Sequence, residues 1–250
     1  MIYLSETSKV IEDETTSCVA DRTPLLPANI AVETPIQGAA YREVDRLADP
    51  LAGIQVRRAT HRTDLEKVYA VRYRGYAKYF GDPMQVREAL DQTPGCLLLL
   101  ATDARGHALG TLRLLDRRYG PIELDNYLDM DQLLPSKRHA IVEATRYSVP
   151  ACPASKWIKL ALCKAYFRYC RDTLAHTMLI WIRPSAEREY QRMLFEKVIG
   201  AGAFSHPRLG NLPHQTWLLD VQSAPARYRE YASSLYTLFE EEEHPHIRYD

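Results

Sequence analysis

Three apolar segments of strand length follow one another in the middle of the chain, at residues 96–103, 108–116 and 141–149. The first two, CLLLLATD and ALGTLRLLD, flank the turn sequence DARGH, a pattern that predicts a β-hairpin. The third, IVEATRYSV, is mainly apolar on both of its alternating faces and ends at Pro150, which indicates a strand in the interior of a sheet. Consecutive strands of this kind place a sheet at the centre of the fold.

The patterned segments on either side add strands and helices to this sheet. In chain order we expect a strand at 54–60, a helix at 63–80 and, after the three central strands, a helix at 155–173, a strand at 178–184, a helix at 185–199, a strand at 214–221 and a last helix at 225–243. Thr63 and Glu66 have the spacing of a capping box for the first helix. Residues 117–139 are predicted to be an irregular polar insertion. The order predicts an α/β (α+β) fold with a mixed, mostly antiparallel central sheet and helices on both faces.

Composition excludes several classes of protein. Basic and acidic residues number 32 each, so the whole chain carries no charge signal for nucleic-acid binding. No uninterrupted apolar run reaches the roughly 18–20 residues of a membrane span, and the first ten residues lack the order of a secretory signal. Five cysteines without a CxxC pair argue against a disulfide scaffold and a thiolate zinc site. We therefore expect a cytoplasmic protein with no transmembrane segment, metal or nucleic-acid partner.

Residues 1–53 differ from the rest of the chain in charge and in pattern. They hold nine acids and four bases, a net charge of −5, and they show little periodicity before about residue 40. This composition predicts a flexible acidic extension, although the segment could also fold back over a basic surface. We expect the folded domain at 54–222, followed at 223–250 by the last helix and an acidic tail.

Four charged side chains lie where the pattern calls for apolar ones: Arg72 in the apolar stripe of the first helix, Arg113 in the second hairpin strand, and Glu143 and Arg146 in the third strand. Strict alternation places Glu143, Thr145 and Tyr147 on one face of that strand and Arg146 and Ser148 on the other. A buried arginine needs a partner or a ligand, and a carboxylate in apolar surroundings acquires a raised pKa that suits a general base. These charges predict a polar site within the sheet. The alternative is a set of structural ion pairs, for example Glu143 with Arg72.

The helix at 155–171 has a one-sided charge distribution. It carries no acid and five bases, which are Lys156, Lys159, Lys164, Arg168 and Arg171. Its apolar residues form a separate stripe, so the bases are predicted to lie on the opposite, exposed face. This face could bind an acidic partner or a phosphate group, or it could be a plain solvated surface.

The segments VRYRGY (71–76), GTLRLL (110–115) and EATRYSV (143–149) resemble, in order and spacing, the three signature segments of the autoinducer (acyl-homoserine-lactone) synthases. They are equally similar to those of the related N-acyl amino acid synthases, such as N-acyltyrosine synthase. Both groups belong to the GNAT acyltransferase superfamily, and the resemblance covers residues 54–222. It implies a GNAT-like fold and the transfer of a medium or long fatty acyl chain.

The resemblance also implies roles for individual residues. Arg72, Tyr76, Arg113 and Tyr147 would bind substrate, with Arg72 and Arg113 holding the carboxylate of an amino acid acceptor. Glu143 would accept the proton of the acceptor amine, and Thr145, Arg146 and Ser148 would complete the catalytic motif. The donor would be the acyl-phosphopantetheine of acyl carrier protein, with no tightly bound cofactor. This acidic partner would then dock on the basic helix 155–171.

Departures from the family pattern distinguish between the two branches. The autoinducer synthases carry a tryptophan after the first arginine motif and a pair of aspartates before the second strand. This chain has Tyr79 and Phe80 near the first position, and LDQTPG offers only Asp91 at the second. The glycine-free segment ACPASKW (151–157) lacks the loop that grips acetyl-CoA. These features favour an N-acyl amino acid synthase with a tyrosine-like acceptor. The alternatives are a lactone synthase that uses S-adenosylmethionine, a conventional acetyl-CoA enzyme, and an inactive GNAT domain that binds a carrier protein or lipid.

Overall fold

The structure is a computed structural model that describes residues 49, 51–80, 82–136 and 140–250. These residues lie within one compact unit, which spans 35–250. The expected acidic extension at 1–53 lies almost entirely outside the described residues. Its last part is folded, because Leu51 is buried in the same core as Ile54, three residues before the expected start of the domain.

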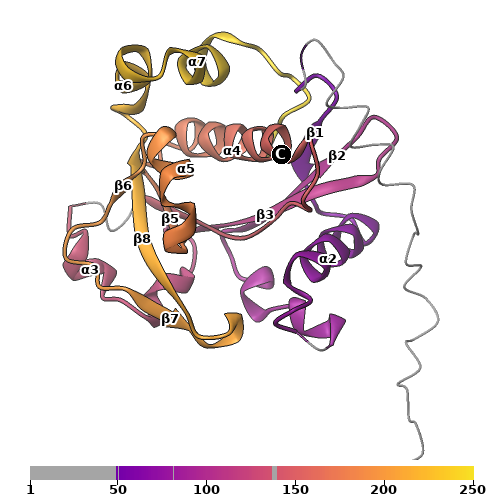
Figure 1. Cartoon of the computed structure of the whole chain (residues 1–250), viewed down its shortest axis with the longest axis horizontal. Coiled ribbons are helices and arrows are strands. Elements are labelled where there is room, and N and C mark those ends of the chain that lie inside the picture. The colour runs from indigo at the N-terminus through magenta and orange to yellow at the C-terminus, as the bar shows by residue number, and fades with distance from the viewer. Residues whose placement is uncertain (1–48, 50, 81, 137–139) are drawn as a thin grey trace, which may run out of the picture. The chain divides into compact units, whose positions relative to one another are not determined.

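The fold is built on an eight-stranded, mostly antiparallel sheet, which confirms the predicted fold class (Figure 1). The strands are β1 (Gln55–Arg58), β2 (Cys96–Thr102), β3 (Ala108–Asp116), β4 (Ile141–Ser148), β5 (Thr177–Ile182), β6 (Glu196–Lys197), β7 (Phe204–His206) and β8 (Leu212–Asp220). Their order is β1-β2-β3-β4-β5-β8-β6, with β7 also paired to β8. Only the β4–β5 pair is parallel among these named strands.

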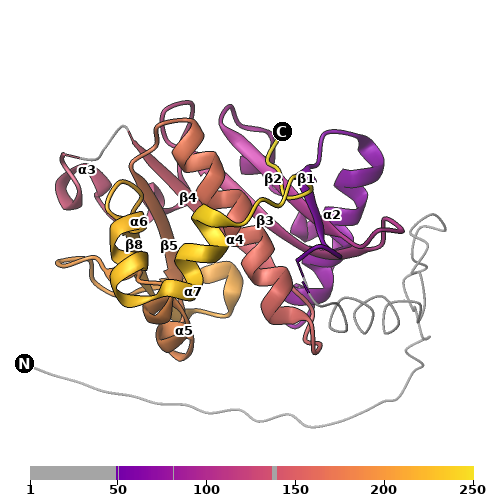
Figure 2. The same cartoon turned by 90° about the horizontal axis from the view of Figure 1, so that it is seen from above.

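Helices cover the two faces of the sheet. They are α2 (Arg62–Tyr76), α3 (Met130–Leu133), α4 (Ser155–Asp172), α5 (Glu187–Arg192), α6 (Ala224–Tyr231) and α7 (Ser233–Tyr236). Figures 1 and 2 show α2 on one face and α4 on the other, with α6 and α7 beyond α4. The apolar residues of β2 are buried on both faces because alternate side chains enter the core under α4 and the core under α2.

The sheet opens between β4 and β5. Their paired residues run from Ile141 and Thr177 to Ala144 and Ile180. Among the described residues, the second half of β4 therefore has no partner strand on that side. The pairing of β4 with β3 also shifts by one residue, and Arg146 has a φ of 50° there. This is a β-bulge, which bends a strand and changes the direction of its side chains.

The bulge overturns the strict alternation predicted for this strand. Glu143, Thr145 and Arg146 all reach the same polar network on the α2 side, whereas Tyr147 packs against the apolar core under α4. Ser148 lies on the α2 side, where its hydroxyl donates to the carbonyl of Val71. The extra residue reverses the facing of every side chain that follows it.

The helix predicted at 185–199 is shorter than expected. A turn at Pro184–Ala186 leads into α5, which ends at Arg192, and Leu194 has a φ of 60°. Glu196 and Lys197 then pair with β8 as β6, while the neighbouring Phe195 and Val198 are buried. Burial of these two side chains against the sheet prevails over the helical pattern.

The C-terminal residues form part of the fold, contrary to the expected tail. The predicted helix at 225–243 breaks at Ala232, and a π-helical turn at Thr237–Glu241 follows α7. The chain then returns to the edge of the sheet, where Ile247 forms a parallel bridge with Val56. His244 is only 2% exposed in this segment. We refer to residues 237–250 as the C-terminal strap.

The first helix also begins differently from the prediction. Its N-cap is His61 rather than Thr63, and the N-cap side chain makes no hydrogen bond. Glu66, the expected second half of a capping box, pairs instead with Arg87 at the surface.

Candidate active site

A cavity of about 730 Å³ lies where β4 and β5 separate. Residues of α2, β4, α4, β5, α5 and β8 line it. The opening in the sheet therefore gives a small molecule access to side chains and backbone groups at the centre of the fold. Such a cleft, bounded by a few polar groups in apolar walls, is the usual form of a ligand site.

The walls of the cavity divide into an apolar part and a basic rim. The apolar part includes Leu160, Cys163, Tyr166, Met193, Phe195 and Leu235. The rim includes the exposed side chains of Lys78, Lys156, Arg183 and Arg192. Lys159 also lines the cavity and forms a 2.8 Å ion pair with Glu189. This division suits a molecule with a long apolar end and an anionic end.

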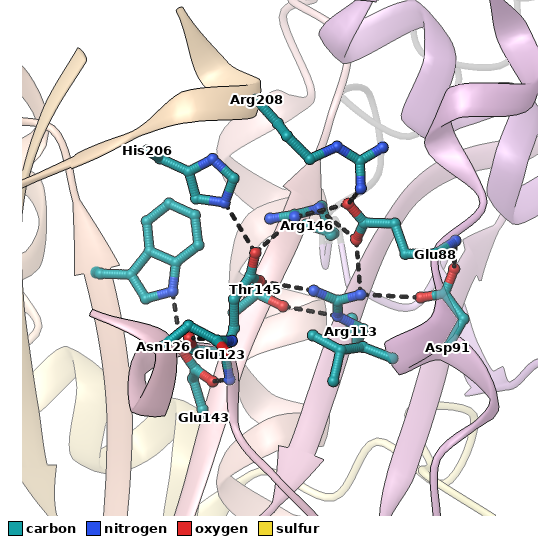
Figure 3. A network of polar contacts seen from close by, with 12 residues as sticks. Glu88, Asp91, Arg113, Glu123, Asn126, Glu143, Thr145, Arg146, His206 and Arg208 are labelled. Carbon is teal, nitrogen blue, oxygen red and sulfur yellow. Dashed lines mark hydrogen bonds and ion pairs between the residues drawn. The ribbon is translucent and has the colours of Figure 1, made fainter. Parts of the chain in front are cut away.

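A buried network of arginines and carboxylates lies beside the cavity, on the α2 side of the sheet (Figure 3). Arg113, which is fully buried, donates through Nε to the hydroxyl of Thr145 at 2.8 Å. Its Nη atoms contact the carboxylates of Glu88 at 2.7 Å, Asp91 at 3.1 Å and Glu123 at 2.7 Å. Arg113 is thus fully engaged with the protein itself.

Arg72 and Arg146 also bind carboxylates of the network, and Arg208 contacts Glu88 at 2.8 Å. Arg72 donates through Nη1 to Asp91 at 2.7 Å and to the carbonyl of Val86 at 2.8 Å. Arg146 contacts both carboxylate oxygens of Glu88, each at 2.7 Å, and Glu123 at 2.6 Å. The predicted Glu143–Arg72 pair is therefore wrong, because Asp91 is the partner of Arg72.

The two arginines predicted to hold the acceptor carboxylate lie outside the cavity lining, and Arg72 Nε and Nη2 are buried without a hydrogen-bond partner among the described residues. Arg72 and Arg113 are both 0% exposed, each binds acidic side chains of the protein, and neither is among the residues that line the cavity. Of the predicted arginines, only Arg146 lines it. Its Nη1 atom is buried and has no hydrogen-bond partner among the described residues. A free guanidinium N–H beside a cavity can bind a carboxylate.

Glu123 is the ionised carboxylate at the centre of the network. Burial by itself would raise its pKa, but the hydrogen bond from His206 and the charges of Arg146 and Arg113 outweigh burial and lower the pKa to about 2. His206 approaches Glu123 Oε1 at 2.8 Å through Nε2. The carboxylate therefore remains charged at neutral pH and holds the two arginines in place.

Glu143 is in the opposite state. Burial, followed by the nearby charge of Glu123, raises its pKa to about 8. Its two oxygens accept hydrogen bonds from the backbone N–H of Glu123 at 2.5 Å and from the indole Nε1 of Trp181 at 2.8 Å. Trp181 lines the cavity, and Glu143 is not among its lining residues. The indole thus links the Glu143 carboxyl group to the cavity wall.

The structure places the remaining predicted residues around the same opening. Thr145, Tyr147 and Ser148 line the cavity, as does Tyr76. The Tyr76 hydroxyl donates to the carbonyl of Tyr147 at 3.0 Å and so ties the end of α2 to the bulged half of β4. The three signature segments of the sequence therefore meet at one place.

The basic face of α4 is only partly available to a partner. Lys164 is buried and bonded to His244 Nδ1 at 2.7 Å, and Arg168 donates to the carbonyls of His244 and Ile247. Burial lowers the pKa of Lys164 to about 8. Arg171 lies near Glu240 at 3.6 Å. The C-terminal strap thus covers Lys164 and binds Arg168, whereas Arg171 stays exposed. This corrects the prediction of a continuous exposed face and leaves Lys156 and Lys159 at the cavity rim.

Several residues of the site were not predicted from the sequence. Glu88 supplies a second carboxylate three residues before Asp91, although only Asp91 was expected there. Glu123 comes from the insertion that was predicted to be irregular, where residues 123–126 form a short 3-10 helix. His206 and His214 lie on β7 and β8 around Trp181. The Glu88–Asp91 spacing was the one available signal, because the other residues are distant in sequence from their partners.

Among the described helices, none combines the length and the apolar character that a membrane crossing requires. No group of three or more histidine, cysteine, aspartate or glutamate side chains is placed to hold a metal ion within the described part of the chain.

Comparison with known proteins identifies the family of the chain. Residues 67–220, more than half of the chain, match the family model of the N-acyl amino acid synthase FeeM. The structure of FeeM, an N-acyl amino acid synthase from uncultured soil microbes, aligns at a TM-score of 0.60 and 13% identity over 71% of this chain and 96% of that chain. No curated protein matches the sequence.

Two acyl-homoserine lactone synthases share the fold. MesI, a CoA-dependent enzyme, aligns at a TM-score of 0.53 and 18% identity, covering 71% of this chain and 95% of that chain. BjaI, described with SAM and isopentyl-CoA, aligns at 0.51 and 14% identity, covering 72% and 90%. At these identities the structures show a common fold. The family match over residues 67–220 goes further: this chain belongs to the FeeM family of N-acyl amino acid synthases and is an acyltransferase of the GNAT-like fold.

Proposed function

We propose that this enzyme transfers a medium or long fatty acyl chain from acyl carrier protein to the α-amine of an amino acid. The observation that carries the proposal is the cavity, because an apolar wall, a basic rim and Arg146 all line it, and Arg146 Nη1 has no hydrogen-bond partner among the described residues. The three parts suit the acyl chain, the phosphorylated carrier arm and the acceptor carboxylate. We place this reaction in the cytoplasm.

The acyl chain would lie along the apolar wall. Cys163 and Tyr166 of α4, Met193 and Phe195 after α5, and Leu235 of α7 all line the cavity. Each methylene group buried there contributes about 0.8 kcal/mol to binding. Chains of several carbons beyond the thioester would therefore be held much more tightly than an acetyl group.

The donor would enter over the basic rim. Lys156 and Arg192 are exposed at the cavity, and both can attract the phosphate of a phosphopantetheine arm and the acidic surface of a carrier protein. The loop before α4 is held by Ser155, whose hydroxyl bonds the carbonyls of Pro150 and Cys152. Its lack of glycine favours a carrier-bound donor over CoA.

The acceptor would bind at the opening between β4 and β5. Arg146 Nη1 would hold its carboxylate, and the rings of Tyr76 and Trp181 line the space next to it. An aromatic acceptor such as tyrosine would stack against these rings. Holding the amine and the thioester together in this gap supplies catalysis by proximity.

The bulge in β4 would stabilise the reaction intermediate. Attack of the amine on the thioester gives a tetrahedral oxyanion, which backbone N–H groups at Arg146–Ser148 would bind. These residues lie beyond the paired part of β4 and β5, so their backbone faces the cavity rather than the neighbouring strand.

One observation favours the sister reaction, lactone synthesis from S-adenosylmethionine. Glu88 and Asp91 together supply two carboxylates before β2, where the sequence indicated one. Both carboxylates bind arginines of the network, however, and this engagement favours a structural role for the pair.

Mass spectrometry of lipid extracts from bacteria that express the full chain tests the proposal. New species at the mass of an amino acid plus a fatty acyl chain would establish the reaction, the acceptor and the chain length. Acyl-homoserine lactones would assign the chain to the sister reaction instead. Incubation of the purified protein with dodecanoyl-carrier protein or dodecanoyl-CoA and tyrosine then compares the two donors. Equal or faster turnover with the CoA donor would contradict a carrier-protein donor.

A further inference from the structure

His214 is a buried histidine on the cavity wall, at the start of β8. Its side chain is only 5% exposed, and the residue is one of those that line the cavity. Its Nδ1 atom has no hydrogen-bond partner in the described part of the chain. A buried ring nitrogen without a partner loses the free energy of a hydrogen bond, so it calls for a ligand.

The groups around His214 keep the ring neutral. Burial lowers its pKa below the ordinary value of 6.5, a hydrogen bond to the backbone of Leu212 raises it, and the positive charges of Arg183 and Arg146 lower it further. The ring packs edge-on against Trp181 at 4.8 Å and lies near Phe204 at 5.8 Å and His206 at 6.4 Å. A neutral imidazole offers one nitrogen lone pair as a proton acceptor.

His214 and Arg146 line the same cavity. Each has a buried nitrogen without a hydrogen-bond partner among the described residues, and both lie against Trp181, at 4.8 Å and 6.0 Å from its ring. An α-amino acid has a carboxylate and an amine one carbon apart, which is the arrangement that would engage an N–H donor and a proton acceptor side by side. Glu143, by contrast, is not among the residues that line the cavity, and it accepts a hydrogen bond from Trp181, which does line it.

We infer that His214 is the catalytic base, whose imidazole takes the proton from the attacking amine of the acceptor. This inference rests on the proposed acyl transfer. The neutral amine forms the new C–N bond, and its proton passes to the imidazole of His214. The C–S bond then breaks, and the imidazolium returns the proton to the departing thiolate. The products are the amide and the free thiol of the donor, so atoms and charges balance.

The test compares three variants of the full chain: His214→Asn, Glu143→Gln and His176→Asn. Asparagine at 214 keeps a hydrogen-bond acceptor near the position of Nδ1 but cannot take up a proton. His176 is exposed at the start of β5, opposite the end that opens, and serves as the matched control. The rate constant kcat is measured against pH with saturating acceptor and acyl donor, because kcat reports groups of the bound complex.

We expect the wild-type enzyme to lose activity below pH 6.5 as His214 becomes protonated, in line with its lowered pKa. His214→Asn should reduce kcat on the order of 10²-fold or more and abolish this acidic limb. His176→Asn should match the wild type. Glu143→Gln should keep the acidic limb, and its thermal unfolding shows whether any loss of rate is structural.

Two outcomes would overturn the inference. One is a His214→Asn enzyme with wild-type kcat and pH profile. The other is a wild-type kcat that falls as the pH drops through about 8, the pKa of Glu143, together with the loss of this fall in Glu143→Gln. That result would return the role of base to Glu143. Either result leaves the acyl transfer intact, whereas a wild-type enzyme that makes no acylated amine would refute the proposed function itself.

Discussion

The backbone N–H of Glu123 donates a 2.5 Å hydrogen bond to Oε2 of Glu143, so two buried glutamates lie in contact with opposite states of protonation. Arginine and histidine partners lower the pKa of Glu123 to about 2, whereas burial, and next the Glu123 charge, raise the pKa of Glu143 to about 8. At neutral pH Glu143 is therefore mostly protonated and Glu123 is ionised. The consequences can be measured through the pH dependence of stability.

Glu143 makes folding stability fall as the pH rises. Its pKa is higher in the folded protein, at about 8, than the ordinary value of 4.5, so its stabilising effect is present below pH 4.5 and is lost as the pH rises through 8. The free energy of unfolding of the wild type, measured with urea from about pH 6 to about pH 9, should therefore decline more steeply than that of Glu143→Gln. The variant should be less stable at neutral pH by about 1–3 kcal/mol, because its amide N–H₂ faces an N–H donor. Parallel curves for the two proteins would show that Glu143 does not titrate in this range.

Glu123→Gln should destabilise the fold strongly. The change removes the charge that two buried arginines, Arg113 and Arg146, share, and breaking a buried ion pair costs about 3–5 kcal/mol. Urea unfolding at neutral pH measures this loss. The control is Glu66→Gln, since Glu66 forms an exposed pair with Arg87 and its loss should cost no more than about 1 kcal/mol. Similar losses in both variants would contradict a buried, ionised Glu123.

Cys163→Phe should shorten the acyl chain that the enzyme accepts. Cys163 lines the apolar wall, and a larger ring there would fill the space for the distal carbons. We expect kcat/KM to shift from longer to shorter chains, by a factor of about four for each methylene group excluded at 0.8 kcal/mol. A series of donors from octanoyl to hexadecanoyl measures the shift.

Leu174→Phe controls for added size, because Leu174 is 77% exposed outside the cavity. An unchanged chain preference in Cys163→Phe would move the acyl site elsewhere.

Lys156→Glu should weaken the use of a carrier-protein donor. Lys156 is exposed at the rim, and reversing its charge replaces attraction of an acidic partner by repulsion. We expect kcat/KM with acyl carrier protein to fall about tenfold, with a smaller effect at high salt. The same ratio with a neutral acyl-pantetheine thioester should change little. Arg171→Glu, on the same helix but near the C-terminal strap, should leave donor use unchanged.

Lys164→Met should loosen the C-terminal strap. Its ammonium group contacts the carbonyls of Leu238 and Glu242 and the ring of His244, and an apolar side chain would leave these acceptors buried without a donor. Each unsatisfied group costs about 1–3 kcal/mol. Thermal unfolding should show a clear loss of stability, and amide hydrogen exchange of residues 237–247 should accelerate. Lys159→Met, which removes only a part-exposed ion pair with Glu189, is the control.

The sequence alone was enough to predict the sheet, the helices α2 and α4, and the meeting of three polar segments. Apolar alternation and helical spacing are local properties, so β2, β3 and β4 could be predicted from their own residues. The charges of Arg72, Arg113 and Arg146 within apolar segments were equally visible, because they break these local patterns. The resemblance to the acyltransferases depended on the same three segments.

Only the tertiary structure decided which groups pair and which remain free. Glu123 lies 20 residues from Glu143, and His206 lies 83 residues from Glu123, distances at which no sequence period acts. The bulge at Arg146 reversed the facing predicted for Tyr147 and Ser148, because one extra residue inverts an alternation of period two. The strap over Lys164 and the free Nδ1 of His214 likewise depend on packing between distant parts of the chain. Sequence patterns determine which side chains must be buried, whereas three-dimensional packing determines the partner that each of them finds.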